Sequence, residues 1–197
     1  MTAAGKLFGT TGLSEVTVAQ ILDHSGVKAP TLYHHFGGKE GLYVAWACQA
    51  FDAMEAEFKA LSAKGLPLHD FLLESCRILL SPRAMDILQV MRDRRWLADP
   101  DSVEQVNDSL NEAVIRQIAR AIQAGTTVKE PRDASQLFVH MVSTRLPQYR
   151  RSDTVEGIPP EAIVDVYLRG IQAMSPVSET VAELSEDQVA VRAEEVK

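Results

Sequence analysis

Residues 17–36, TVAQILDHSGVKAPTLYHHF, contain two short helical patterns separated by a glycine, Gly26. In the first pattern, three apolar residues recur at the i, i+3, i+4 spacing of one helix face; they are Val18, Ile21 and Leu22. In the second, Leu32 and Phe36 lie four residues apart and would point back at that face. Glycine can adopt the left-handed turn that two steeply crossing helices need. The stretch therefore predicts a helix-turn-helix.

The outer face of the second pattern carries candidate DNA contacts. With Leu32 and Phe36 turned inward, helical geometry turns the other side chains partly or wholly outward. They are small, hydroxylic, aromatic and imidazole groups, which suit the floor of a DNA major groove and its phosphate walls. These candidates are Ala29, Pro30, Thr31, Tyr33, His34 and His35.

Three further residues extend this candidate surface. Thr17 stands directly before the first helix, where it is a natural N-cap. Lys28 precedes the second helix and has two interpretations, a phosphate contact or a solvated lysine. Lys39 opens the next helix, whose N-terminal amides would form a phosphate site together with its ammonium group.

Three segments resemble the signature of the TetR family of bacterial transcriptional repressors: Gly26-Val27, Thr31–Phe36 (TLYHHF) and Lys39–Leu42 (KEGL). The resemblance runs from about Ala4 to Trp46. TetR-like chains usually begin with another helical turn or two, often bearing Arg or Lys. Relative to that pattern, either the start of this sequence is truncated or misassigned, or the protein makes fewer contacts to the DNA backbone.

Apolar spacing predicts helices along the rest of the chain, and no strand-like alternation occurs. We expect an all-α protein of about nine helices. Its three-helix DNA-binding domain covers residues 1–46, and a helical ligand-binding and dimerisation bundle covers residues 47–175. Residues 176–197 predict an acidic, weakly ordered tail with one helical pattern, Glu186–Glu194. The other expected elements are helices over residues 1–8, 39–63, 68–80, 84–96, 103–125, 132–146 and 161–174, with a turn over residues 9–15.

Composition is ordinary for a soluble globular protein, with 46% apolar and 24% charged residues among 197. No apolar run approaches the roughly 20 residues of a membrane span, and no signal peptide opens the chain, so we expect a cytoplasmic protein. The net charge of −7 argues against a general nucleic-acid coat, and residues 1–47 are neutral, so DNA binding has to be local. The basic run Arg92–Trp96 is interpreted as a solvated helix end.

The two cysteines, Cys48 and Cys76, lack the spacing of metal ligands and lie in helical patterns. We therefore expect buried, reduced thiols and neither a bound metal nor another cofactor. A disulfide switch is the alternative.

The last two large helices predict a dimer interface. Both carry more apolar surface than one pair of core helices needs, and Gly170 permits close approach. The resemblance implies that these helices pair with those of a second subunit. A homodimer has a functional reason, because two recognition helices about 34 Å apart read a palindromic double-stranded operator and add their affinities.

The resemblance also implies a pocket for a small, largely apolar effector between the connecting helix and the dimer helices. Soft and aromatic side chains suit such a ligand, although each is also an ordinary core residue. The candidate wall residues are Met54, Phe58, Cys76, Met91, Trp96, Leu110 and Met141, and the candidate polar groups are His69, His140 and Arg145. An effector that binds the DNA-incompetent shape better would release the repressor from its operator.

Two other classes of protein are less consistent with the sequence. An enzyme is disfavoured because the sequence has no catalytic triad, nucleotide-binding loop or paired-carboxylate motif, and the neighbouring His34 and His35 lack a completing acid or thiol. The stronger alternative is a helical interaction module whose helix-turn-helix no longer binds DNA. A neutral head and a short first helix favour that alternative.

Overall fold

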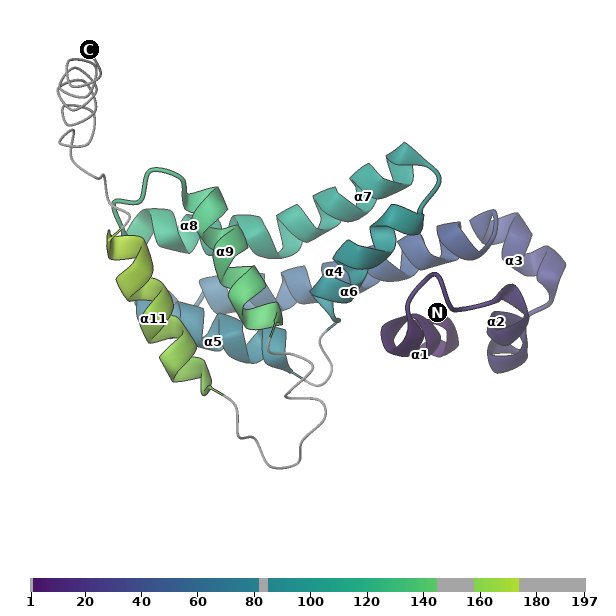
Figure 1. The fold of residues 1–197 in the computed structure, drawn as a ribbon, viewed down its shortest axis with the longest axis horizontal. Helices are drawn as coiled ribbons and strands as arrows, with labels where there is room; N and C mark the ends of the chain where they lie inside the picture. The colour runs from purple at the N-terminus through teal and green to yellow at the C-terminus, as the bar shows by residue number, and fades with distance from the viewer. Residues whose placement is uncertain (1, 82–84, 145–157, 174–197) are drawn as a thin grey trace, which may run out of the picture.

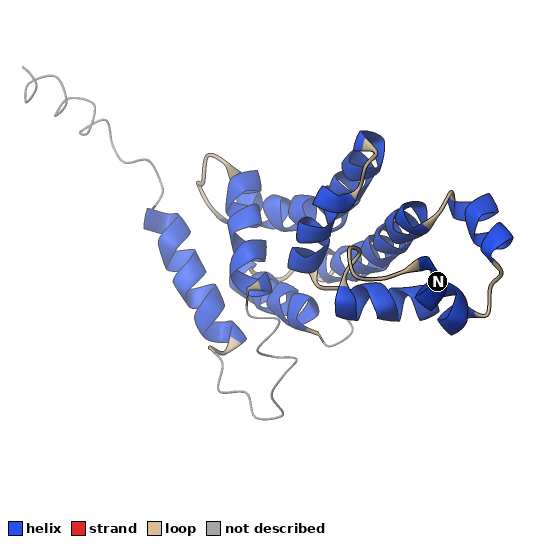
Figure 2. Ribbon diagram, turned by 45° about the vertical axis from the view of Figure 1, so that its right-hand side comes forward, coloured by secondary structure: helices blue, strands red, loops and turns tan. Residues whose placement is uncertain are grey.

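A computed structural model describes residues 2–81, 85–144 and 158–173 of the chain. Within these ranges the regular secondary structure is entirely helical (Figure 2). When the unbroken run from Pro100 to Gly125 is counted as one helix, the described residues form nine helices, which confirms the predicted fold class. The predicted tail of residues 176–197, its helical pattern and Arg145 lie outside the described ranges.

The head consists of α1 (Thr2–Thr11), α2 (Val18–Ser25) and α3 (Ala29–Phe36). The first helix is longer than predicted, because it continues through Gly9 and leaves a shorter turn that includes Gly12. Figure 1 shows the head at one end of an elongated molecule.

The long helix α4 (Lys39–Ser62) connects the head to the body, as predicted. It runs along the long axis from α3 to the far end, where α5 begins (Figure 1). Its apolar residues form the central seam of the core, and those fully buried include Tyr43, Phe51 and Phe58. The head is fixed to α4 by aromatic contacts, since the Phe8 ring lies 5.1 Å from Tyr43 and 5.6 Å from Trp46 between centroids.

The body surrounds the remainder of α4. Its helices are α5 (Leu68–Leu80), α6 (Ile87–Asp93) with the 3-10 turn Arg94–Trp96, α7 (Pro100–Leu110), the π segment Asn111–Ile115, α8 (Arg116–Gly125), α9 (Pro131–Ser143) and α11 (Pro160–Ala173). Both α7 and the π segment pack along α4, whereas α5, α9 and α11 pack together at the end opposite the head (Figure 1). None of the helices described has both the length and the apolar character needed to cross a bilayer.

The outer faces of α9 and α11 retain exposed apolar side chains. Leu137 on α9 is 45% exposed and Val166 on α11 is 63% exposed. A Cβ placed on Gly170 would meet no atom within 4 Å, so this chain does not fill the space beside it. The inner faces are well packed, as the Tyr167 hydroxyl donates a 2.6 Å hydrogen bond to the Ala134 carbonyl. These two helices therefore have a covered side and an uncovered apolar side.

Candidate nucleic-acid interface and ligand cavities

The first helix of the helix-turn-helix begins with a reciprocal cap. The Gln20 backbone N–H donates to the Thr17 hydroxyl at 3.2 Å, and the Thr17 N–H donates to the Gln20 side-chain oxygen at 2.8 Å. This pair satisfies two otherwise unbonded amides at the helix start. The N-cap predicted at Thr17 is confirmed, and the Thr17 hydroxyl is already engaged within the protein.

The turn and inner face agree with the predicted geometry. Gly26 has φ 67°, the left-handed conformation that ends α2, and its N–H bonds to the Leu22 carbonyl. Ile21 and Leu32 are buried, and the Phe36 ring is partly buried against the same core. The packing of α2 on α1 and of α3 on α4 thus fixes which side of α3 faces solvent.

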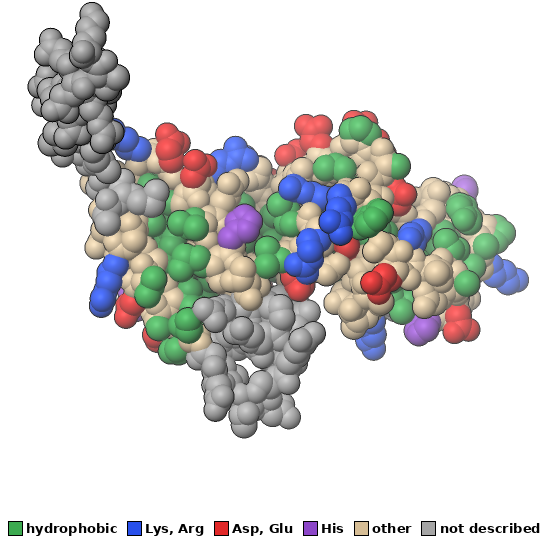
Figure 3. Space-filling model, viewed as in Figure 1, with side chains coloured by type: hydrophobic (Ala, Val, Ile, Leu, Met, Phe, Trp, Pro, Cys, Tyr) green, Lys and Arg blue, Asp and Glu red, His purple; other side chains and the backbone are tan. Residues whose placement is uncertain are grey.

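The outer face of α3 is open to solvent. Tyr33 is 53% exposed, and Thr31, His34 and His35 are also exposed. The space-filling view shows apolar, basic, acidic and His side chains at this end of the molecule (Figure 3). The His34 and His35 rings lie 5.1 Å apart edge to face, but no group of three His, Cys, Asp or Glu side chains among the described residues could hold a metal.

The residues flanking α3 differ in their surroundings. Lys28 is exposed at the N-terminus of α3 and makes no side-chain cap, while Ala29 and Pro30 form the first helical turn. Lys39, by contrast, points inward. Its ammonium group donates to the Leu13 carbonyl at 2.8 Å and to the Val16 carbonyl at 2.9 Å. These two bonds fix the α1–α2 turn to α4 and hold the ammonium group, the predicted phosphate contact, against the head.

A buried carboxylate, which sequence reasoning missed, joins the body to the head. Asp93 at the end of α6 is only 2% exposed. It accepts hydrogen bonds from the Leu13 backbone N–H at 2.9 Å, the Tyr43 hydroxyl at 3.3 Å and the Gln89 side-chain amide at 2.8 Å. Burial, with the nearby Asp93 charge second, raises the pKa of Tyr43, so the phenol stays a donor. The three bonds hold α6, α4 and the α1–α2 turn at one point.

A second bond joins the same parts of the chain. The Ala98 backbone N–H, just after the 3-10 turn, donates to the Glu40 carboxylate on α4 at 2.9 Å. Glu40 lies in the first turn of α4, directly after the head. Both ends of the segment Asp93–Ala98 are therefore hydrogen-bonded to the head or its junction with α4.

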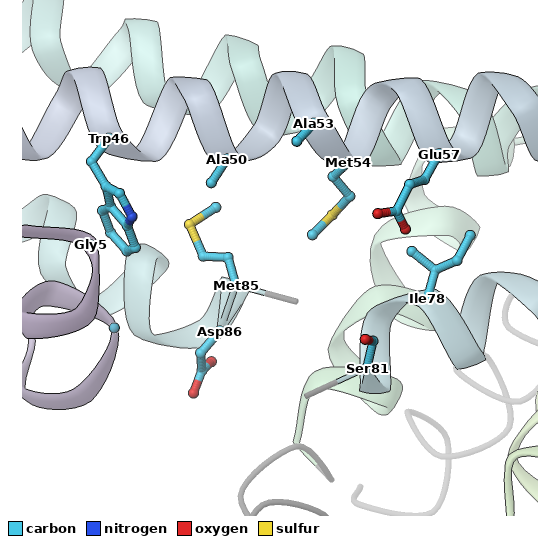
Figure 4. A pocket seen from close by; sticks show the side chains of 11 residues that line it. Gly5, Trp46, Ala50, Ala53, Met54, Glu57, Ile78, Ser81, Met85 and Asp86 are labelled. Atoms are coloured by element: carbon cyan, nitrogen blue, oxygen red, sulfur yellow. The ribbon is translucent and has the colours of Figure 1, made fainter. Parts of the chain in front are cut away.

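One cavity, which we call the head–body cavity, lies between α1, α4, α5 and the start of α6. Its volume is about 600 Å³. Figure 4 shows Trp46, Met54 and Glu57 extending from α4 into this space, with Met85 reaching toward them. Its lining residues are Gly5, Gly9, Trp46, Ala50, Ala53, Met54, Glu57, Ile78, Ser81, Met85 and Asp86. Of the predicted wall residues, it contains Met54.

A second cavity of about 440 Å³, the α6–α9 cavity, lies between α6, α7 and α9. It is lined by α6, the 3-10 turn, α7, the π segment and α9. The lining residues are Ile87, Leu88, Met91, Arg94, Asn107, Leu110, Asn111, Ile115, Arg132, Gln136, Val139 and His140. It unites two predicted wall residues, Met91 and Leu110, with one predicted polar group, His140.

The other predicted pocket residues line neither of these cavities. Phe58 and Cys76 are fully buried in the core, and Met141 is partly buried against it. Trp96 is 52% exposed and stacks under the Arg95 guanidinium at 5.2 Å. His69 forms ion pairs with Asp70 and Asp165 at the surface. Apolar spacing found buried positions, but a cavity forms only where helices distant in sequence fail to fill the space between them.

Residues 1–46 match the family model described as bacterial regulatory proteins, tetR family. Over 119 residues the chain is 28% identical to the HTH-type transcriptional repressor ComR of Escherichia coli K12, covering 49% of this chain and 56% of ComR. The chain thus spans little more than half the length of this curated relative.

Solved structures share the fold over most of the chain. The reduced form of E. coli NemR superposes with a TM-score of 0.68 at 18% identity, covering 86% of this chain and 93% of NemR. Salmonella enterica GusR gives 0.65 at 19% identity, covering 87% and 92%. The regulator FadR from Bacillus subtilis, solved with stearoyl-CoA, gives 0.63 at 15% identity, covering 86% and 94%. These similarities confirm the architecture.

Proposed function

Because residues 1–46 belong to the TetR family of bacterial regulatory proteins, we propose that this protein is a ligand-responsive transcriptional repressor that binds a palindromic operator as a dimer. The observation that carries the proposal is the outer face of α3. It presents Thr31, Tyr33 and His34 to solvent, while Leu32 on the opposite face is buried. A helix held in this way can enter a major groove without unfolding the head.

The proposed DNA contacts follow from exposure. They comprise the predicted residues on or beside α3, which are the exposed Lys28, Pro30, Thr31, Tyr33, His34 and His35 and the partly exposed Ala29. Thr17 is left out of the proposed contacts because its hydroxyl caps α2. Lys39 is left out because its ammonium group donates to two backbone carbonyls in the head. Lys28 is then the lysine nearest to α3 that can reach a phosphate.

The dimer is proposed on the uncovered side of α9 and α11. Leu137 and Val166 are large apolar side chains left in solvent there, and the space beside Gly170 is open. Pairing this side with its copy would bury both side chains in a four-helix interface. Two heads held by such an interface would read half-sites about 34 Å apart, or a multiple of that distance.

Release by an effector is proposed to act through α6. This helix lines the α6–α9 cavity, and its N-cap, Asp86, lines the head–body cavity. It ends at Asp93, whose carboxylate accepts a hydrogen bond from the Leu13 N–H in the head. A ligand that displaces α6 would change the position of this carboxylate relative to α4 and the α1–α2 turn. The ligand and the operator would then favour different arrangements of the head and exclude each other by mass action.

A gel-shift titration with DNA flanking the protein's own gene tests the proposal. Wild-type protein should retain a fragment with a palindrome and bind it more weakly as salt is raised. Tyr33→Ala should weaken binding at least about tenfold, the loss of roughly one good contact. The matched control is Trp96→Ala, which removes an equally exposed aromatic side chain outside the head and should leave affinity unchanged.

Size-exclusion chromatography completes the test. Tyr33→Ala should elute as the wild-type dimer, because the side chain lies in the head, far from α9 and α11 (Figure 1). If no fragment with a palindrome is retained, the operator proposal is wrong and the interaction-module alternative takes its place. If Trp96→Ala weakens binding as much as Tyr33→Ala, the proposed surface is misplaced.

A further inference from the structure

The α6–α9 cavity has an apolar floor and a basic rim. Six apolar side chains line it, and they are Ile87, Leu88, Met91, Leu110, Ile115 and Val139. The charged residues in its lining are Arg94 and Arg132, both cationic, and no carboxylate lines it. The head–body cavity has the opposite character, since its charged lining residues are Glu57 and Asp86.

The two guanidinium groups are positioned by neutral partners. Arg94 donates to the Asn107 side-chain oxygen at 2.6 Å, and Arg132 donates to the Asn111 side-chain oxygen at 3.2 Å. Neither arginine forms an ion pair within the described part of the chain, unlike Arg77 and Arg116. An amide orients a guanidinium without cancelling its charge, and each guanidinium keeps further N–H donors. The rim therefore presents two oriented, uncompensated positive charges.

The π segment forms part of this wall. Its first residue, Asn111, holds Arg132, and its last residue, Ile115, contributes to the apolar floor. A π segment inserts one extra residue into a helix, costs stability, and often occurs at functional sites. Here the extra residue separates α7, which packs along α4, from α8, which packs on α9. The irregular turn thus coincides with the basic rim of the cavity.

These observations define the ligand by its chemistry. An apolar body would displace water from the floor, and a planar anionic group would receive paired N–H donors from an arginine. We propose that the α6–α9 cavity binds an amphipathic carboxylate, with its hydrocarbon chain on the floor and its carboxylate at Arg94 and Arg132. The volume of about 440 Å³ lies within the range of small-molecule sites. The role of this cavity as the effector site rests on the proposed function. Binding of a carboxylate in the cavity does not depend on that function.

Calorimetric titration of the full chain with decanoate, in the absence of DNA, tests the site. Decanoate should bind at least about tenfold more tightly than decanol or decyltrimethylammonium, since the anion alone gains the charged hydrogen bonds. Arg94→Met and Arg132→Met keep much of the side-chain length and remove the charge. Each should lower decanoate affinity about tenfold and leave decanol affinity nearly unchanged.

The matched control is Arg116→Met. Arg116 lies at the start of α8, is paired with Glu112 and does not line the cavity. This variant should bind decanoate like wild type, and circular dichroism should show equal helicity for all three variants. Failure of decanoate to bind, equal affinity for decanol, or equal loss in Arg116→Met would each overturn the proposal.

A gel shift with decanoate separates this inference from the proposed function. Arginine-dependent decanoate binding that leaves operator binding unchanged would support the carboxylate site and overturn its role as the effector site. Release of the operator by decanoate in wild type, but not in Arg94→Met, would support both. Operator binding without any decanoate binding would leave the repressor proposal standing and remove the carboxylate site.

Discussion

The Asp93 carboxylate accepts a 2.9 Å hydrogen bond from the Leu13 backbone N–H, although the two residues are 80 positions apart. Asp93 ends the helix that lines the α6–α9 cavity and whose N-cap lines the head–body cavity, and Leu13 lies in the turn between α1 and α2. The contact is therefore a buried polar link between the helix that lines the α6–α9 cavity and the head. Its buried position makes it sensitive to small displacements of α6.

Asp93→Ala should lower the free energy of unfolding by about 3 kcal/mol, because the buried Leu13 N–H and Tyr43 O–H lose their acceptor. Tyr43→Phe removes only the 3.3 Å bond and should cost about 1 kcal/mol. Urea denaturation measures both. Asp52→Ala, at an exposed site on α4, is the control and should change little. An equal effect of Asp93→Ala and Asp52→Ala would refute the structural role of the buried carboxylate.

Gly41→Ala should destabilise the junction between α3 and α4. A Cβ at Gly41 would lie 1.9 Å from the Phe36 carbonyl oxygen, so one helix has to move. We expect a loss of at least about 2 kcal/mol, as for an overpacked core site. Gly9→Ala is the matched control, since its Cβ would meet nothing within 4 Å and alanine favours the helix by up to about 1 kcal/mol. In thermal denaturation, the melting temperature should therefore fall for Gly41→Ala and rise for Gly9→Ala.

Val166→Asp should convert the proposed dimer to a monomer. The substitution places a charge on the uncovered side of α11, which the proposed interface would bury. Light scattering coupled to size exclusion should give half the wild-type mass with unchanged helicity. Val27→Asp makes the same change at another exposed valine, between α2 and α3, and should remain dimeric. A dimeric Val166→Asp protein would place the interface elsewhere.

The two thiols should react at different rates. Burial, reinforced by the Glu161 charge, raises the pKa of Cys76 to about 12, so only about one thiol in ten thousand is ionised near pH 8. Cys48 is partly exposed and accepts a 3.3 Å hydrogen bond from the Ser109 hydroxyl. A maleimide should label one cysteine in the native protein and both in denaturant.

Cys48→Ser identifies the labelled thiol, and the native variant should label slowly. Its rate should rise about tenfold per pH unit above pH 8, because the thiolate fraction of Cys76 rises in that proportion below its pKa of about 12. The raised pKa also means that Cys76 stabilises the fold below about pH 9 and loses this contribution as pH rises toward 12. Equal labelling of both native thiols would contradict the buried position of Cys76.

Local patterns were sufficient for the helix-turn-helix. Its geometry depends on i, i+4 spacing and on Gly26, whose φ of 67° only a residue without Cβ adopts freely. The same patterns identified α4 and the helix ending at Gly125. Such features extend over a few turns and depend little on distant residues, which is why the fold class could be predicted.

The cavities and the Asp93 contact depend on distant residues. Asp93 lies within the basic run Arg92–Trp96, and this explains its assignment to a solvated helix end. That assignment is correct for Arg92 and Arg95, which are exposed, and wrong for Asp93. One signal was available, since Asp93 continues the i, i+3 series of Ile87 and Val90 on the buried face of α6. No local pattern in the sequence indicates that Asp93 bonds to Leu13 in the head.

Because Lys39 bonds to two backbone carbonyls, each head keeps only Lys6 and Lys28 as exposed lysines. If both reach phosphates in a dimer, about four counterions are released, and the slope of log affinity against log salt is about −3.6. A fourfold rise in ionic strength would then weaken operator binding by roughly a hundredfold. Because Lys39 is held within the head, the salt dependence of the proposed operator binding should be no steeper than two lysines per head allow.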